Sequence, residues 1–236
     1  MDEKGIRINK FLSEAGVCSR REGDKLVEAK RVTVDGEYVT TGTRVLPGQH
    51  VFVDGKEVCL EEEEVVLLFN KPRGIVCTAE KREKDNVIDF LHYPVRIYPV
   101  GRLDKDSHGL LILTNQGDLT NEILKASNYH EKEYVVRVNK PITGQFMMHM
   151  QQGVYLSELD KKTAPCKVKK LDDKTFSIVL TQGLNRQIRR MCRELDYHVR
   201  DLKRVRIMDY TLDGIAEGSY RELTKAEIAQ LKKQLL

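Results

Sequence analysis

No apolar run in the sequence approaches the roughly 20 residues that an α-helix needs to span a bilayer, so we expect no membrane contact. The first ten residues, MDEKGIRINK, begin with acids and lack the apolar core of a secretory signal, which makes a cytoplasmic protein the expectation. The sequence also has no internal repeat and no low-complexity tail. Its 236 residues are enough for one large domain or two modest ones.

Metal-binding and nucleotide-binding motifs are also missing. The five cysteines are an odd number and no two of them form a CxxC pair, which argues against a disulfide framework and against a zinc site. The six histidines show neither HxxxH nor HExxH spacing. We therefore expect no metal site.

The net charge is only +4, but basic residues are concentrated in one segment. Residues 182–206 hold eight Lys or Arg and three acids, a net charge of +5. Such a cluster favours a phosphate-rich partner, although a solvated helix face also explains many basic clusters. Residues 61–64 are four glutamates, and because like charges repel we expect a hinge there. The predicted organisation is a domain at 1–60, an acidic hinge at 61–64 and a domain at 65–236.

The first domain is predicted to be a small α+β unit. Apolar spacing predicts a short helix that ends at Gly16, and Ser19 with Glu22 forms a capping box for a second helix from Arg20 to about Lys30. Two Asp-Gly pairs, each between alternating runs, predict hairpins at 32–39 and 51–58.

The second domain mixes strands and helices without regular alternation. Apolar or alternating runs predict the strands, which are expected at 65–69, 74–78, 110–113, 133–138 and 175–180. Capping residues and helical spacing predict the helices, which are expected at 118–125 with Asp118 as cap, 187–195, and 225–236 behind a Thr224–Glu227 capping box. This order favours an α+β fold with a mixed, largely antiparallel sheet and flanking helices.

The most informative segment is GRLDKDSHGLLILTNQGDL, residues 101–119. It places Asp104 in a polar turn just before the buried strand predicted at 110–113. A carboxylate held in this way is rigid and still reachable, as a nucleophile must be. Aspartate also caps turns without any chemical role, and the residues by themselves leave both interpretations open.

This segment is similar to the GRLDxxSxGLLLLTNDG motif of the pseudouridine synthases, in which the aspartate is the catalytic residue; Ile112 and Gln116 depart from the pattern. Three further segments resemble motifs of that family in the same order along the chain: NKPRGIV at 70–76, HEKEYVVRV at 130–138 and QGLNRQIRRMC at 182–192. The resemblance implies an active site made of Asp104, Tyr134 and Arg189.

The reaction of that family explains these residue types. Uridine and pseudouridine are isomers, so N1–C1′ must break and C5 must join C1′ without redox change or net hydrolysis. The resemblance therefore implies that no cofactor is needed, which fits the absent metal and nucleotide motifs. Asp104 could attack C1′, add to C6 or assist loss of the 2′ proton, and the sequence does not decide among these routes. Arg189 would stabilise the charge on Asp104, and Tyr134 would stack on the uracil and carry a proton.

Residues 7–39 resemble the S4 RNA-binding domain, which implies RNA contacts around the start of its second helix, from Arg7, Lys10, Ser19, Arg20 and Arg21. A helix N-terminus also favours phosphate by itself. The target uridine must leave its base stack before reaction, so we expect further RNA contacts in the second domain. The candidates are Lys71, Arg102, Arg186, Arg190, Lys203, Arg204 and Arg206.

The resemblance therefore implies an S4-domain pseudouridine synthase, expected to be a monomer, that modifies a uridine of ribosomal RNA. The 23S RNA of the large subunit is the expected substrate and a tRNA is a second candidate. The alternatives are a 16S small-subunit enzyme and a non-catalytic RNA-binding assembly factor. A glycosidase that uses Asp104 with Asp106 is disfavoured, because the two residues lie on one turn.

Overall fold

The computed structural model describes residues 5–60, 63–80, 82–125 and 129–235 and divides into two compact units. The first unit holds residues 1–64 with the short segments 94–96 and 115–117, and the second holds the rest of the chain. Glu61 and Glu62 lie outside the described residues, so the acidic hinge stays a prediction. None of the helices among the described residues has the length and apolarity to cross a membrane.

The first unit has two helices, α1 (Ile8–Glu14) and α2 (Arg20–Glu28). The hydroxyl of Ser19 accepts a hydrogen bond from the Glu22 amide at 3.2 Å and the Glu22 carboxylate accepts one from the Ser19 amide at 2.8 Å, so the predicted capping box is confirmed. Its six short strands are β1 (Ile6–Arg7), β2 (Val32–Val34), β3 (Glu37–Tyr38), β4 (Arg44–Val45), β5 (Val51–Val53) and β6 (Lys56–Val58).

Both predicted hairpins of the first unit are confirmed. Strands β2 and β3 pair across Asp35-Gly36, and β5 and β6 pair across Asp54-Gly55. All four turn residues have positive φ, which is what the two-residue turn that suits a twisted hairpin requires. The sheet order is β3-β2-β5-β6, and its apolar face packs on the buried residues of α1 and α2.

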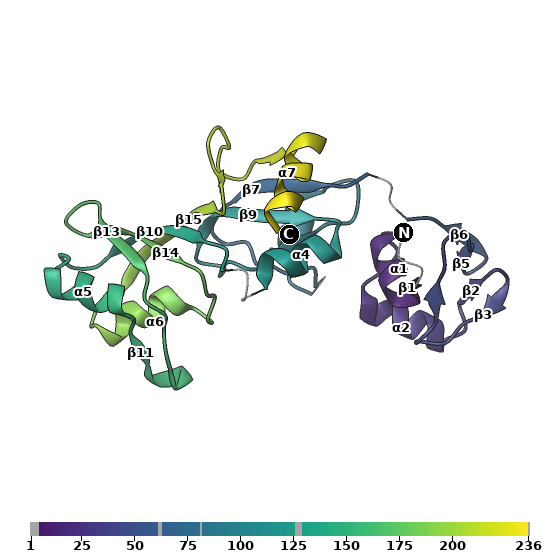
Figure 1. Ribbon diagram of the computed structural model, residues 1–236, viewed down its shortest axis with the longest axis horizontal. Helices are drawn as coiled ribbons and strands as arrows, with labels where there is room; N and C mark the ends of the chain where they lie inside the picture. The colour runs from purple at the N-terminus through teal and green to yellow at the C-terminus, as the bar shows by residue number, and fades with distance from the viewer. Residues whose placement is uncertain (1–4, 61–62, 81, 126–128, 236) are drawn as a thin grey trace. The chain divides into compact units, whose positions relative to one another are not determined.

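The second unit is built on a mixed sheet (Figure 1). Within the described residues it has nine strands, in the order β13-β14-β10-β15-β9-β7-β17, with β16 on β15 and β8 on β9. The strands are β7 (Val66–Lys71), β8 (Tyr98–Val100), β9 (His108–Thr114), β10 (Lys132–Val138), β13 (Lys167–Lys170), β14 (Thr175–Leu180), β15 (Val199–Ile207), β16 (Tyr210–Thr211) and β17 (Tyr220–Glu222). Among these pairings only β9 with β15 is parallel. The predicted mixed, largely antiparallel sheet is confirmed.

Helices of the second unit flank two different parts of this sheet, and Figure 1 labels four of them. The helices of this unit are α3 (Val87–Leu91), α4 (Gly117–Leu124), α5 (Gly144–Gln152), α6 (Gln187–Glu194) and α7 (Lys225–Leu235). Helices α5 and α6 share one apolar core with β10 and β14, and α4 and α7 share a second core with β7 and β9. A small arm of β11 (Tyr155–Leu156), the short 3₁₀ helix η2 (Ser157–Leu159) and β12 (Lys161–Lys162) follows α5.

Two local predictions in the second unit are wrong. Residues 74–78 form a turn with a single bridge from Val76 to Asn86, because Gly74 adopts φ +86° and its amide donates to the Lys105 carbonyl. Asp118 lies inside the first turn of α4 and is not its cap, since the helix begins at Gly117. The Thr224–Glu227 capping box is confirmed by reciprocal hydrogen bonds of 2.8 and 3.3 Å.

Candidate active site

Asp104 lies in the turn between β8 and β9. Its carbonyl accepts a hydrogen bond from the Ser107 amide at 3.1 Å, which closes the turn. The Asp104 side chain is 32% exposed, while Ser107 is buried. The sequence-based expectation of a carboxylate that is fixed by its backbone and open to solvent therefore matches the geometry.

Two arginines meet this carboxylate: Arg186, the residue just before α6, and Arg189 within α6. Arg186 places Nη1 at 3.1 Å and Arg189 places Nε at 3.6 Å from Oδ2 of Asp104. Both arginines also lie close to Asp106, at 3.5 and 3.2 Å. Arg189 further donates to the hydroxyl of Ser107 at 3.0 Å. Two cations thus lie against the Asp104 carboxylate and hold the turn.

The turn keeps its place because β9 runs unusually close to β15. Gly109 has φ +101°, and a Cβ built on it would lie 2.2 Å from the carbonyl oxygen and 2.8 Å from the amide nitrogen of Arg204. Only glycine fits such an approach without moving backbone. The glycine five residues after Asp104 is therefore required by the packing of these two strands.

Tyr134 projects from β10 into the cleft that Asp104 borders. The cleft has a volume of about 600 Å³, within the usual range for ligand sites. Beside Tyr134 and Asp104 lie four apolar side chains, Leu180, Leu184, Ile188 and Leu202. A flat ring with apolar neighbours next to a carboxylate suits a planar base attached to a sugar.

Lys71 and Arg204, predicted to contact RNA phosphates, are buried in the structure. Lys71 is fully buried and its Nζ donates to the carbonyls of Pro72 at 2.8 Å and Ser107 at 2.9 Å. Arg204 is 4% exposed and its Nε donates to the Leu110 carbonyl at 2.6 Å. Neither side chain therefore lies at the surface: Lys71 secures the turn that carries Asp104, and Arg204 lines the cleft, where a contact with RNA stays a prediction.

The other predicted contacts of this unit lie at or near its surface. Arg102 is exposed at the rim of the cleft. Lys203 is half-buried opposite His108 in the β15–β9 pair. Arg206 forms ion pairs with Glu131 at 2.9 Å and Glu133 at 3.1 Å, so two acids already balance its charge.

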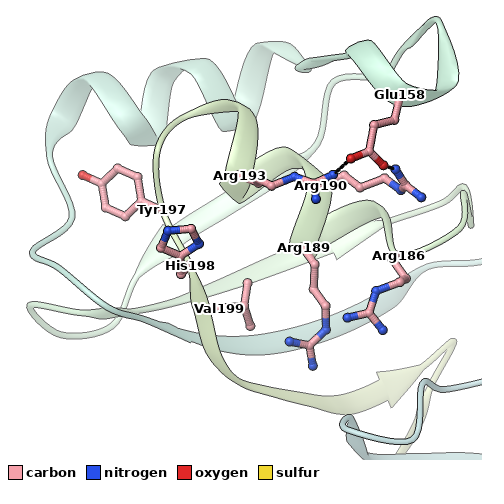
Figure 2. A pocket seen from close by; sticks show the side chains of 8 residues that line it. All are labelled: Glu158, Arg186, Arg189, Arg190, Arg193, Tyr197, His198 and Val199. Atoms are coloured by element: carbon pink, nitrogen blue, oxygen red, sulfur yellow. Dashed lines mark hydrogen bonds and ion pairs between the residues drawn. The ribbon is translucent and has the colours of Figure 1, made fainter.

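The remaining arginines of α6 face the arm that follows α5. Figure 2 shows Glu158 of this arm between Arg190 and Arg193, while Arg186 and Arg189 extend away from it. Residues of α6 and the segment that follows it line the hollow shown there. The structure therefore pairs Arg190, a predicted RNA contact, with an acid of its own chain.

In the first unit, Arg20 and Arg21 are exposed at the start of α2. Arg7 is exposed and donates weakly to the Thr41 carbonyl at 3.4 Å, and Lys10 pairs with Glu14 at 3.6 Å. The Ser19 hydroxyl accepts the capping hydrogen bond from the Glu22 amide at the start of α2. These predicted residues thus gather around the N-terminal ends of two helices, apart from the catalytic candidates in sequence and unit.

Sequence reasoning missed two contributors to the site. Gln187 is buried, accepts from the Leu184 amide at 3.1 Å and donates to the Gln182 side chain at 3.2 Å, which fixes the loop that carries Arg186. Lys132, two residues before Tyr134, lines the cleft. Its position two residues before Tyr134 in the HEKEYVVRV segment was the available signal, since a strand places residues i and i+2 on one face.

Comparison with known proteins adds independent findings. Residues 65–194 match the RNA pseudouridylate synthase family and residues 6–51 match the S4 domain. The chain is 48% identical to the dual-specificity RNA pseudouridine synthase RluF of Escherichia coli (strain K12), over 99% of this chain and 80% of that protein. It is 37% identical to ribosomal large subunit pseudouridine synthase B of Bacillus subtilis (strain 168), over 96% and 95%.

A more distant relative and a solved structure are also similar to this chain over nearly its whole length. Ribosomal small subunit pseudouridine synthase A of Yersinia pestis is 33% identical over 96% of this chain and 98% of its own. A crystal structure of a pseudouridylate synthase superposes with a TM-score of 0.70 at 28% identity, covering 96% of this chain and all of that one.

Proposed function

The chain belongs to the RNA pseudouridylate synthase family, and from this premise we propose that it converts a specific uridine of 23S ribosomal RNA to pseudouridine. The observation that carries the proposal is the Asp104 carboxylate, held by Arg186 and Arg189 in a cleft that Tyr134 also lines. These groups answer the needs of the isomerisation: an ionised carboxylate, cations that stabilise it, and a flat surface for the base.

Asp104 is the proposed catalytic residue. Its carboxylate attacks C1′, adds to C6 or assists loss of the 2′ proton, and each route requires the ionised form that the two arginines stabilise. The fixed turn holds the carboxylate before substrate arrives, so the reaction needs little reorganisation of this group. Arg189 is the proposed partner of Asp104 and Tyr134 the proposed stacking residue.

The RNA contacts are proposed to come from both units. In the S4 unit, the proposed contacts form a patch of four residues, Arg7, Lys10, Arg20 and Arg21. Residues 1–60 hold ten bases and ten acids, so this unit must bind RNA through a local surface and not through net charge. In the catalytic unit the exposed Arg102, at the rim of the cleft, is proposed to hold the strand from which the uridine is flipped.

The choice of 23S RNA is supported by the relatives. The relative that is 48% identical is called a dual-specificity RNA pseudouridine synthase, and the one that is 37% identical is named for the large ribosomal subunit. We propose a tRNA as the second substrate. A monomer that acts in the cytoplasm completes the proposal, since its ribosomal RNA substrate is made there.

The test is tritium release from [5-³H]uridine-labelled RNA, because C5 loses its hydrogen when it joins C1′. Large-subunit rRNA, small-subunit rRNA and tRNA are incubated separately with the wild type and with Asp104→Asn. We expect release from large-subunit rRNA with the wild type and no detectable release with Asp104→Asn. Asp173→Asn, an exposed aspartate in the turn before β14, is the matched control and keeps wild-type release.

Two results would contradict the proposal. Release from small-subunit rRNA alone identifies the 16S enzyme. RNA binding without release from any of the three RNAs identifies a non-catalytic RNA-binding factor.

A further inference from the structure

Arg204 is a buried cation that lines the proposed catalytic cleft and lacks a full set of partners. Its side chain projects from β15 and is 4% exposed. Nε donates to the Leu110 carbonyl, but Nη2 is buried and makes no hydrogen bond within the described part of the chain. A buried guanidinium nitrogen without an acceptor is costly to the folded protein, so its presence calls for a function.

The strand register places this guanidinium beside the proposed base-binding ring. Arg204 lies opposite Tyr134 in the antiparallel β10–β15 pair. Directly opposite residues of such a pair project from the same face of the sheet, with their Cβ atoms about 5 Å apart. The Arg204 and Tyr134 side chains therefore enter the cleft as neighbours.

Two lysines share the region with Arg204. Lys132 is half-buried, lines the same cleft and donates from Nζ to the His130 carbonyl at 3.0 Å. Burial and the charge of Arg204 lower the pKa of Lys132, and burial also lowers the pKa of Lys71. Across residues 5–60, 63–80, 82–125 and 129–235, no carboxylate lies within 4 Å of the charged nitrogens of these three residues.

The charges of Asp106 and Asp104 act on Lys71, so within the described residues Arg204 and Lys132 are the part of this group without an ion-pair partner, and they make a preformed site for negative charge. Like charges that the fold holds close together repel, and the repulsion is relieved when an anionic ligand enters. Arg186 and Arg189 differ from this group, because Asp104 and Asp106 already balance them.

We propose that Arg204, with Lys132 beside it, binds a negatively charged oxygen of the flipped-out nucleotide through the free N–H groups of Nη2. This inference rests on the proposed function. The oxygen has two possible sources within the substrate: a phosphate next to the target uridine, or a carbonyl oxygen of the uracil that becomes anionic during the reaction.

The uracil source follows from the chemistry of every route open to Asp104. If C1′ is attacked or the 2′ proton is lost, N1–C1′ breaks and its electron pair stays on the uracil, where N1, O2 and O4 share the charge. If Asp104 adds to C6, the electron pair of the C5–C6 bond moves to give an enolate on O4. In every route N1–C1′ breaks, C5 bonds to C1′, any bond to Asp104 is broken again, and a proton removed from C2′ is returned. C5 loses its proton to solvent and N1 gains one, so the product is an isomer. Donors already aimed at the oxygen would stabilise that charge.

The test uses the full-length protein with the RNA from which the wild type releases tritium. The kcat, the KM and the dependence of KM on salt are measured for wild type, Arg204→Gln and Arg204→Lys. Arg137→Lys, at an exposed position of the neighbouring strand β10, is the matched control and keeps wild-type values. Thermal unfolding of each variant reports whether it is folded.

If the oxygen belongs to the uracil, kcat of Arg204→Gln falls roughly 100-fold at nearly constant KM, as for loss of one donor to a developing oxyanion. Arg204→Lys keeps more activity than Arg204→Gln, because it keeps the charge. If the oxygen belongs to a phosphate, KM rises, kcat holds, and the slope of log KM against log salt decreases by roughly 0.7 to 0.9.

Folded Arg204→Gln with kcat and KM both within twofold of the wild type overturns the inference. Should neither Arg204 variant fold, Lys132→Gln is measured in the same assay. A fall in kcat or a rise in KM of Lys132→Gln supports the site, and wild-type values of both overturn the inference. An inactive wild type on all three RNAs is a different outcome, since it refutes the proposed function itself.

Discussion

At the scale of single residues, Gly109 shows how backbone packing serves the site. The parallel pair of β9 and β15 carries Ser107 and Asp104 at one end and Arg204 on the facing strand. A side chain at Gly109 would enter the backbone of Arg204, and no rotamer change could relieve the overlap because the atoms it meets are main-chain atoms.

Gly109→Ala is therefore expected to destabilise the protein strongly. The alanine Cβ at 2.2 Å from a carbonyl oxygen and the positive φ together make a loss of about 3 kcal/mol or more in the free energy of unfolding the expected result. Urea denaturation followed by circular dichroism measures it. Gly144→Ala, at the open start of α5 with no atom within 4 Å of the added Cβ, is the control and should change the free energy by less than about 1 kcal/mol. Equal stability of the two variants would contradict this account of the strand pair.

The residues of the proposed site were predictable from sequence to different degrees. The ordered motifs singled out Asp104, Arg189 and Tyr134, which the fold brings together, and their catalytic roles stay a prediction. The burial of Lys71 and Arg204 was not predictable, because it depends on which backbone carbonyls the folded sheet brings to their nitrogens. A lysine or arginine in a basic segment looks solvent-exposed until tertiary structure supplies such partners.

At the scale of elements, helix α6 divides its charges between two neighbours. Arg186, the N-cap residue, and Arg189 reach the turn of Asp104, while Arg190 and Arg193 reach Glu158. The buried residues Ile188, Met191 and Cys192 form its third face. One short helix thereby connects the apolar core, the catalytic turn and the arm after α5.

Glu158→Gln is expected to increase RNA affinity. The substitution removes the negative charge that now balances Arg190 and Arg193 and leaves two cations for phosphate (Figure 2). Binding to the RNA substrate, measured at several salt concentrations, should become a few-fold tighter at low salt, with a slope of log affinity against log salt steeper by up to about one neutralised phosphate. Glu222→Gln, an exposed acid on β17, changes the net charge equally and is the control. If the two variants bind equally well, the arginines beside Glu158 do not face RNA.

Helices and strands could be predicted where a local sequence signal existed, and could not where tertiary packing determines the secondary structure. The hairpins at Asp35-Gly36 and Asp54-Gly55 and the apolar strand β9 were predictable from turn chemistry and burial. The longest strand, β15, reads VRDLKRVRI and was not assigned, because its charged residues hide a central strand whose Leu202, Arg204 and Ile207 are buried. Residues 74–78 show the reverse: an apolar run forms a turn because the tight loop at Gly74 leaves it without a pairing strand.

At the scale of the whole molecule, net charge says little about RNA binding. The chain carries only +4, and its first 60 residues have no net charge, yet both units present exposed arginines at defined places. Affinity should therefore depend on a few positions and not on overall charge.

The double variant Arg20→Glu/Arg21→Glu tests this view. Because it replaces two cations that we propose bind phosphate with two charges that repel phosphate, it should raise KM at least tenfold and reduce the salt slope by roughly two neutralised phosphates. The kcat should stay constant, because the catalytic cleft is in the other unit. Lys30→Glu/Lys56→Glu reverses two exposed charges elsewhere in the S4 unit and serves as the control. A fall in kcat for the first variant at unchanged KM would contradict a pure binding role.

The strand order of the catalytic sheet also determines when the enzyme matures during translation. Phe69 in β7 pairs with Tyr220 in β17, and β9 lies between β7 and β15. The S4 unit can fold as soon as it leaves the ribosomal exit tunnel, since its pairings lie within residues 6–58. The turn of Asp104 can take its final structure only after α6 and β15 have been synthesised. The edge of the sheet is completed later, when β17 pairs with β7, because long-range pairings form slowly. A nascent chain can thus hold a folded RNA-binding unit while its catalytic centre is still unassembled.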